Sequence, residues 1–308
     1  MNERSHLGES ELLCASIFCS HGPVGAGLVN AWLDRGHSVS VVVVGHFDPL
    51  GLERWRHLAE RGVVVIGAPY PADWARILRA LHVHARQPDV LLSYSFMQKI
   101  PRFMLQKHRF GGINFHPSLL PHYRGSNPVR AMIADRALHE YGGVSAHVMT
   151  QRFDAGDLIA QVPMAPAEYR SVARCLETVG AIVAHLATEI VPEFCAGMIE
   201  PRAQASGGSE SSASPKTLTL VADEWSLNEI QAAFAFLRPK TELRVQLASH
   251  RGTIPVHALR NRRSGSTGKP PRIGLLAVDL DCADGRVSLF RDNWPGRVAG
   301  RIAGWRRR

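Results

Sequence analysis

Residues 39–44 of the chain are valine at every position but one. An apolar run of this kind lacks the alternation of a half-exposed strand and is typical of a parallel strand covered on both faces. Apolar segments at 12–19, 63–66 and 90–93 predict further strands, and the segments between them predict helices. This alternation favours an α/β fold with a doubly wound, mostly parallel, Rossmann-like sheet.

A segment rich in serine and glycine divides the chain of 308 residues. Residues 201–217 have too few apolar side chains to order themselves, so they are predicted to be a flexible linker. The linker separates an N-terminal domain, residues 1–200, from a small C-terminal domain, residues 218–308. Short predicted strands at 254–259, 273–281 and 286–290 indicate that the second domain is β-rich, with an OB-like barrel as the expected arrangement.

The net charge of +9 is concentrated after residue 217, where sixteen Lys and Arg stand against eight Asp and Glu. The remaining twenty basic and nineteen acidic residues nearly cancel. A basic C-terminal domain attracts phosphates, nucleic acid or an acidic carrier, and a solvated surface is the alternative. A homodimer formed through this domain is a further expectation.

Cysteine usage and hydropathy bear on the compartment. The five cysteines form no Cys-x-x-Cys pair, which fits a reducing cytoplasm. The first eleven residues lack the apolar run of a signal peptide, and no uninterrupted apolar stretch reaches eighteen residues. The sequence therefore predicts a cytoplasmic protein with no membrane partner.

Residues 112–121, Gly-Ile-Asn-Phe-His-Pro-Ser-Leu-Leu-Pro, carry the first candidate functional side chains. Alternation along a strand places Asn114 and His116 on one face. Pro117 cannot donate to a sheet ladder, so the strand is predicted to end at His116. Ligands of open α/β sheets bind at this carboxyl-terminal edge.

A second polar turn follows an alternating segment at residues 144–149 and carries Asp154, with Gly156 free to adopt a positive φ. An amide, an imidazole and a carboxylate that meet can hold a carbonyl oxygen, move a proton and orient the base. The three side chains therefore indicate acyl transfer.

These motifs resemble the folate-dependent formyltransferase family, which includes methionyl-tRNA, glycinamide ribonucleotide, sugar and amino-acid formyltransferases. The resemblance rests on Asn-x-His-Pro-Ser-Leu-Leu-Pro at 114–121 and Gly-Val-Ser-Ala-His at 143–147, with Asp154 seven residues after His147. It covers roughly residues 12–200 and makes residues 1–200 the formyltransferase domain. It implies that Asn114, His116 and Asp154 are catalytic. His147 is expected to contact these residues rather than the substrate.

The resemblance implies 10-formyltetrahydrofolate as cosubstrate and no metal. Core packing is the alternative for Phe96 and Met97. The glycine-rich turn at residues 20–27 lacks the glycine spacing of a dinucleotide-binding motif. Phosphate binding by this turn stays an alternative. Expected folate contacts are Phe96, Met97, Gln98, Ser118, Leu119, Leu120, Pro121, Ala155 and Gly156, and expected acceptor contacts are His21, Gly22, His122, Tyr123 and Arg124.

The acceptor is inferred from a departure from the family pattern. Methionyl-tRNA formyltransferases carry a basic insertion after the second strand, whereas residues 45–52 here contain no Lys or Arg. This favours a small-molecule amine, either an amino-sugar nucleotide or an amino acid such as hydroxyornithine. Methionyl-tRNA formylation, hydrolysis of 10-formyltetrahydrofolate and a catalytically silent binding module remain the alternatives, so nucleic acid is not excluded.

Overall fold

The computed structural model describes residues 11–20, 22–45, 53–83, 87–211, 215–238, 240–293 and 295–299. The chain divides into two compact units. Unit 1 comprises Met1–Ser126, Gly143–Pro163 and Leu176–Glu210. Unit 2 comprises Asn127–Gly142, Met164–Cys175 and Ser211–Arg308. Unit 2 therefore includes two segments from within residues 1–200, in addition to the predicted C-terminal domain.

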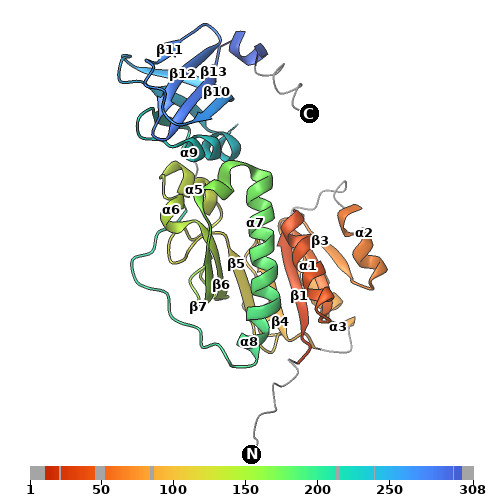
Figure 1. Cartoon of the computed structure of the whole chain (residues 1–308). Coiled ribbons are helices and arrows are strands. Elements are labelled where there is room, and N and C mark those ends of the chain that lie inside the picture. The colour runs from red at the N-terminus through yellow and green to blue at the C-terminus, as the bar shows by residue number, and fades with distance from the viewer. Residues whose placement is uncertain are drawn as a thin grey trace, which may run out of the picture. The chain divides into compact units, whose positions relative to one another are not determined.

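Unit 1 contains a seven-stranded sheet in the order β3-β2-β1-β4-β5-β6-β7 (Figure 1). The strands from β3 to β5 pair in parallel, whereas β6 and β7 extend the sheet with antiparallel pairs. This confirms the predicted α/β fold with a mostly parallel sheet. The strands are β1 (Cys14–Ser20), β2 (Ser38–Gly45), β3 (Val65–Ala68), β4 (Val90–Tyr94), β5 (Gly112–His116), β6 (Gly143–Val148) and β7 (Leu158–Pro163).

Apolar side chains cover both faces of the parallel strands. Helices α3 (Trp74–Val83) and α4 (Arg102–Leu105) contribute Ile77 and Met104 to a core that also holds Phe18 of β1. Helix α1 (Pro23–Asp34) buries Leu28 and Trp32, and helix α2 (Glu53–Glu60) follows β2. Burial on both faces explains the nearly unbroken valine run of β2.

The later part of a long helical run covers the sheet of unit 1. The run consists of α7 (Val172–His185), a π-helical segment (Leu186–Ile190) and α8 (Val191–Cys195). The run Val172–Cys195 has a mean hydropathy of 1.3 and is long enough to cross a membrane by length and composition alone. Core helices pass the same test, and Val179, Val183 and Leu186 are buried.

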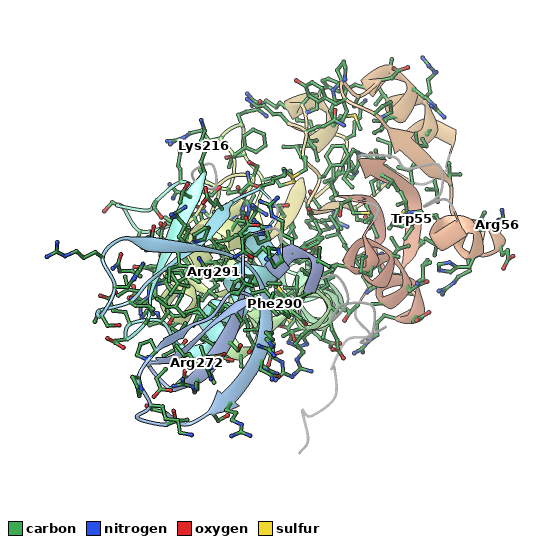
Figure 2. The ribbon with its side chains drawn as sticks, turned by 90° about the horizontal axis from the view of Figure 1, so that it is seen from above. Trp55, Arg56, Lys216, Arg272, Phe290 and Arg291 are labelled. Carbon is green, nitrogen blue, oxygen red and sulfur yellow. The ribbon has the colours of Figure 1, made fainter. Side chains whose placement is uncertain are left out.

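Unit 2 contains a six-stranded sheet in the order β11-β12-β13-β10-β9-β8. The strands are β8 (Thr217–Val221), β9 (Glu242–Gln246), β10 (Thr253–Ser264), β11 (Arg272–Ile273), β12 (Ala277–Cys282) and β13 (Gly285–Arg291). In Figure 2, Phe290 lies within this unit and Arg272 at its periphery, in agreement with the burial of Phe290 and the exposure of β11. The second sheet confirms the predicted β-rich C-terminal region.

Short helices complete unit 2. They are α5 (Pro128–Ala134), α6 (Leu138–Tyr141), a 3-10 helix (Pro166–Arg170), α9 (Leu227–Ala232) and a π-helical segment (Ala233–Leu237). The N-terminus of α9 has the capping box that its sequence predicts. The Ser226 side chain accepts a hydrogen bond from the Glu229 backbone N–H, and the Glu229 carboxylate accepts one from the Ser226 N–H.

One sequence-based expectation needs correction. The segment predicted to be a flexible linker is hydrogen bonded to other parts of unit 1 at Arg202, Gln204 and Ser209. The sequence pattern missed this because the partners lie tens of residues away. The arginines at positions 260, 262 and 263 lie on β10 with their side chains exposed. The basic tail at 305–308 lies outside the described residues.

We expect Ser226→Ala to lower the free energy of unfolding by about 1 kcal/mol, because it removes the acceptor of the capping box. Chemical denaturation monitored by circular dichroism measures this change. The matched control is Ser249→Ala, at an exposed turn position, which should change the free energy by less than about 0.5 kcal/mol. Equal effects of the two substitutions would contradict the role of the cap.

Candidate active site

The candidate site begins where β5 ends. Ile113 and Phe115 are fully buried in the core, while Asn114 and His116 point to the other face, as the alternation predicts. Asn114 pairs with His147 of the antiparallel strand β6, so the two side chains lie next to each other. Strand β5 ends at His116, directly before Pro117, which confirms the predicted boundary.

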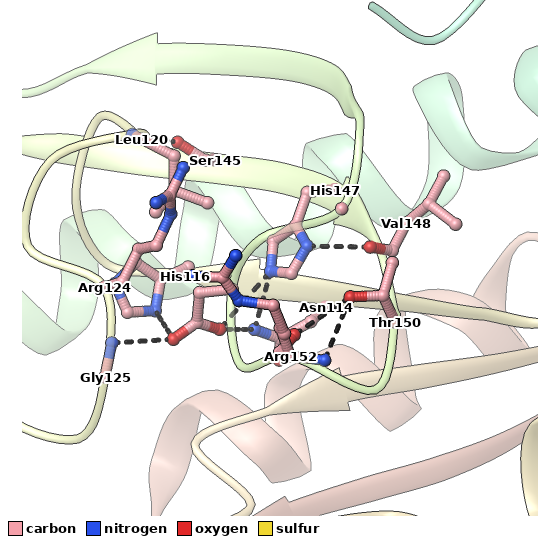
Figure 3. Close-up of polar contacts among 12 residues, drawn as sticks. Asn114, His116, Leu120, Arg124, Gly125, Ser145, His147, Val148, Thr150 and Arg152 are labelled. Atoms are coloured by element: carbon pink, nitrogen blue, oxygen red, sulfur yellow. Dashed lines mark hydrogen bonds and ion pairs between the residues drawn. The ribbon is translucent and has the colours of Figure 1, made fainter. Parts of the chain in front are cut away.

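The side chains of Asn114 and His147 lie next to each other in Figure 3, and the turn between β6 and β7 brings Asp154 to this pair. Asp154 has a φ of +51°, and the turn passes very close to β6 at Gly156. A Cβ atom at Gly156 would lie 1.8 Å from the carbonyl oxygen of Val148, so only glycine fits there. The close approach folds the turn back toward β5.

The carboxylate of Asp154 is the meeting point of the site. Its Oδ1 accepts a hydrogen bond from Asn114 Nδ2 at 3.2 Å and lies 3.5 Å from His147 Nε2. Its Oδ2 accepts a hydrogen bond from the Gly125 N–H at 2.8 Å and lies 3.5 Å from His116 Nδ1. The carboxylate is only 10% exposed and therefore joins β5, β6 and the loop after β5. The structure brings the predicted trio together.

The surroundings of Asp154 favour its ionised form. Burial alone raises the pKa of this carboxyl group. The polar contact with the His147 side chain, the charge of His116 and the hydrogen bond from the Gly125 N–H outweigh burial and lower the pKa of Asp154 to about 2. A group of this kind is a permanent anion at neutral pH.

His116 is held from both sides of its ring. Its Nε2–H donates to the carbonyl of Tyr123 at 2.8 Å, and its Nδ1 faces Asp154. Burial lowers the pKa of His116, and His147 adds to this effect, whereas Asp154 and the Tyr123 carbonyl limit the fall by favouring the imidazolium. Because Asp154 lies beside it, the buried imidazole of His116 can still take up a proton.

His147 was expected to contact the catalytic residues rather than the substrate, and in the structure it lies next to Asn114 and Asp154. Its Nδ1–H donates to the carbonyl of Val148 at 3.0 Å. Its Nε2 lies 3.1 Å from Asn114 Nδ2, so in neutral His147 this nitrogen accepts a hydrogen bond from the amide. His147 thus sets the direction in which the Asn114 carboxamide points.

The loop after β5 is attached to the sheet through Ser145 of β6, which sequence reasoning missed. The Ser145 hydroxyl donates to the carbonyl of Ser118 at 2.6 Å and accepts from the backbone N–H of Leu120 at 3.0 Å. The Gln161 side chain donates to Ser145 Oγ and to the carbonyl of Leu120, each at 2.9 Å. Ser145 lies two residues before His147 in the predicted strand, so strand alternation was the available signal.

The residues expected to contact folate lie in different environments. Phe96 is buried against Phe18 in the core, so only its backbone is left for a ligand. The Gln98 side chain joins Ala68 to Ala72, through bonds of 2.9 Å each. Met97 is 45% exposed. Of the others, Ser118, Leu120 and Gly156 are buried, while Leu119, Pro121 and Ala155 are partly exposed.

The residues expected to contact the acceptor are only partly described. His21 lies outside the described residues, and Gly22 is the N-cap of α1. His122 is partly exposed, whereas Tyr123 is buried. The guanidinium of Arg124 donates to Gln204 Oε1 from Nε at 3.1 Å and from Nη2 at 2.6 Å. Among the described residues, no group of three or more His, Cys, Asp or Glu side chains could hold a metal ion.

The comparison with known families agrees with this geometry. Residues 18–173, half of the chain, match the profile of the family described as formyl transferase. The chain belongs to the formyl transferase family. A stretch of 119 residues, 39% of this chain, is 33% identical to a methionyl-tRNA formyltransferase of Bacillus cytotoxicus. A stretch of 123 residues is 32% identical to the enzyme of the same name in Bacillus mycoides. These matches cover only 37% and 38% of the two relatives.

Solved structures of formyl transferases share the fold. An N-formyltransferase from Helicobacter canadensis, in complex with folinic acid and dTDP-3-aminofucose, aligns over 91% of this chain and 99% of its own, with a TM-score of 0.57 and 14% identity. Glycinamide ribonucleotide transformylase 1 from Symbiobacterium toebii aligns over 63% of this chain and 95% of its own, with a TM-score of 0.51 and 22% identity. At these identities the likeness concerns the fold.

The low pKa of Asp154 predicts how stability depends on pH. Its contribution is fully present above the ordinary carboxyl pKa and is lost as the pH falls toward 2. Between about pH 5 and pH 2, we expect the unfolding free energy of the natural protein to fall by roughly 2 kcal/mol more than that of Asp154→Asn. Urea denaturation at a series of pH values measures both slopes, and equal slopes would contradict the stabilising contacts of Asp154.

Proposed function

We propose that the protein is a folate-dependent N-formyltransferase that moves the formyl group of 10-formyltetrahydrofolate to an amine. The observation that carries this proposal is that Asn114 and His116 meet at the largely buried carboxylate of Asp154, which lies 40 residues after Asn114 in the sequence. Membership of the formyl transferase family supports it.

Each of the three side chains has a chemical role in this proposal. The carboxamide of Asn114 donates a hydrogen bond to the formyl oxygen, where negative charge develops as the amine attacks. His116 donates a second hydrogen bond and takes part in moving the proton that leaves the amine. Asp154 orients the imidazole and stabilises its charged form from 3.5 Å. The catalytic machinery thus pairs two donors with one fixed anion.

The donors are engaged with protein groups in this structure, which defines a requirement for catalysis. The His116 Nε2–H is bonded to the Tyr123 carbonyl. A formyl oxygen that accepts this proton must replace that carbonyl, so the loop after β5 moves when substrates bind. The Tyr123 φ of +59° shows that the carbonyl is presented by an uncommon local conformation.

The residues around the site fit a pteridine. Met97, after β4, and Phe153, beside Asp154, are 45% and 59% exposed, and both offer apolar surface of the kind a flat ring packs against. Ala155 and Gly156 add backbone amide and carbonyl groups next to Asp154. When bound, 10-formyltetrahydrofolate supplies the formyl group, and these residues would hold its ring.

For the acceptor we propose a small-molecule amine, of which a nucleotide-linked amino sugar is the first candidate. The structures that align with nearly the whole chain include a sugar 3N-formyl transferase studied with dTDP and 5-N-formyltetrahydrofolate, with a TM-score of 0.57 over 92% of this chain. The methionyl-tRNA formyltransferases match about two-fifths of the chain, which keeps a tRNA acceptor as the second candidate. An amino acid such as hydroxyornithine remains a third possibility for the test.

We expect Asn114→Ala and His116→Ala each to lower the rate of formyl transfer by roughly a hundred-fold or more, because each removes a donor to the reacting carbonyl. Release of tetrahydrofolate from 10-formyltetrahydrofolate measures the rate. The matched control is His139→Ala, an exposed histidine of unit 2, which should keep the natural rate. A full rate in His116→Ala would rule out the proposed site.

A screen of amines separates the alternatives for function. We expect tetrahydrofolate to be released only when an acceptor amine is present, and fastest with a nucleotide-linked amino sugar. Methionyl-tRNA, hydroxyornithine and a reaction without amine are the comparison arms. Release without any amine would show a hydrolase, whereas no release with any amine while folate still binds would show a binding module. Fastest release with methionyl-tRNA would overturn the small-molecule proposal.

A further inference from the structure

A segment after the last helix of unit 1 lies against both loops of the candidate site. We name residues 202–210 the strap. Its Arg202 exchanges two backbone hydrogen bonds with Leu158 at the start of β7, at 2.8 and 2.9 Å. Its Ser209 accepts a hydrogen bond from the Tyr123 N–H through its side chain and one from the Arg124 N–H through its carbonyl, both at 3.0 Å. The strap therefore connects the turn of Asp154 with the loop after His116.

The strap passes close to the loop after β5. A Cβ atom at Gly208 would lie 2.2 Å from the carbonyl oxygen of Pro121, a distance that no side chain can occupy. Within the strap, Gln204 is partly buried, whereas Arg202, Ala203, Ala205 and Ser206 are exposed. Gln204 is thus turned toward the site while its neighbours face outward.

The carboxamide of Gln204 is fully used by the two loops. Its Nε2 donates to the carbonyl of Asp154 at 2.8 Å and to the carbonyl of Gly156 at 2.7 Å. Its Oε1 accepts two hydrogen bonds from Arg124. One side chain therefore satisfies the backbone of the Asp154 turn and the only charged side chain of residues 117–125.

The Asp154 turn needs this support. A φ of +51° is uncommon for a residue with a side chain, and it persists when surrounding contacts over-determine it. The carboxylate of Asp154 is held by Asn114 and Gly125, and its backbone carbonyl is held by Gln204. The side chain and the backbone of Asp154 are thus both restrained, and Gln204 is the residue that restrains the backbone.

We propose that Gln204 is a positioning residue of the transfer reaction, which holds Asp154 against His116 by clamping the Asp154 turn to the loop that carries Arg124. This inference rests on the function proposed above for Asp154 and His116. Gln204 contacts neither reacting group and acts through Asp154. The strap is then part of the active site, although it follows the family motifs by some fifty residues.

The inference predicts a change that a purely structural role would not cause. The titratable groups that face His116 are Asp154 and His147. If the Asp154 turn relaxes, its carboxylate moves away from His116 Nδ1 and no longer favours the imidazolium. The pKa of His116 should then be lower than in the natural protein, while His147, fixed to the Val148 carbonyl, keeps its position.

The experiment compares the full-length natural chain with Gln204→Met and a matched control, Gln246→Met. Gln246 lies in unit 2, and its side chain likewise donates to two backbone carbonyls, of Leu247 at 3.2 Å and His250 at 3.1 Å. The His116 ring is titrated by NMR, with its signal assigned through a His116→Asn variant. Should Gln204→Met fail to fold, Gln204→Ala removes the same carboxamide with a smaller side chain.

We expect His116 to titrate at a lower pH in Gln204→Met and at its natural pH in Gln246→Met. With an accepted amine, kcat of Gln204→Met should fall by roughly a hundred-fold, with a smaller change in KM for the folate. An unchanged His116 titration in Gln204→Met, or the same shift in Gln246→Met, would overturn the inference. The titration needs no substrate, so it decides the role of Gln204 even if no amine is formylated.

Discussion

The ion-pair and hydrogen-bond contacts of the Asp154 carboxylate are the constraint on which the site depends. A buried anion is costly unless charges and N–H groups surround it. Here the Gly125 N–H, Asn114 and the two histidines supply these partners. Because these partners come from β5, β6 and the loop after β5, satisfying one carboxylate fixes the relative positions of three segments. The geometry needed for chemistry and the geometry needed to stabilise the anion are therefore the same.

The antiparallel end of the sheet makes this arrangement available. A strand parallel to β5 would end at the edge where His116 lies, whereas β6 ends beside Ile113. Strand β6 instead runs against β5, so that His147 pairs with Asn114, and the turn that follows folds back along β6 at Gly156. The close passage of Gly156 beside the Val148 carbonyl places Asp154 over β5. Both loops of the site then meet above the same two strands.

Local patterns in the sequence predicted much of this structure. The valine run of β2, the end of β5 before Pro117 and the Ser226–Glu229 cap depend on neighbours within a few residues, and each was confirmed. The order and types of the motif residues placed the candidate trio. The contacts of Ser145 and Gln204 escaped prediction because their partners lie 27 and 50 residues away along the chain. Strands β8 and β9 were also missed.

The division of the chain into units also depends on contacts between residues that are distant in sequence. A serine- and glycine-rich composition predicted a boundary near residue 201, but the contacts of the strap keep residues up to Glu210 in unit 1. Two internal segments, Asn127–Gly142 and Met164–Cys175, belong to unit 2. Composition reports what a segment can bury by itself, whereas these segments are ordered by partners elsewhere in the chain.

The central claim is that Asn114 and His116, oriented through Asp154, act on one formyl group. A crystal structure of the protein with a non-transferable 10-formyl folate analogue tests it most directly. The account predicts that the formyl oxygen lies within hydrogen-bond distance of Asn114 Nδ2 and of a His116 ring nitrogen, with the Tyr123 carbonyl displaced. A bound analogue whose formyl group lies away from both side chains, with the bond between His116 and Tyr123 intact, would contradict it.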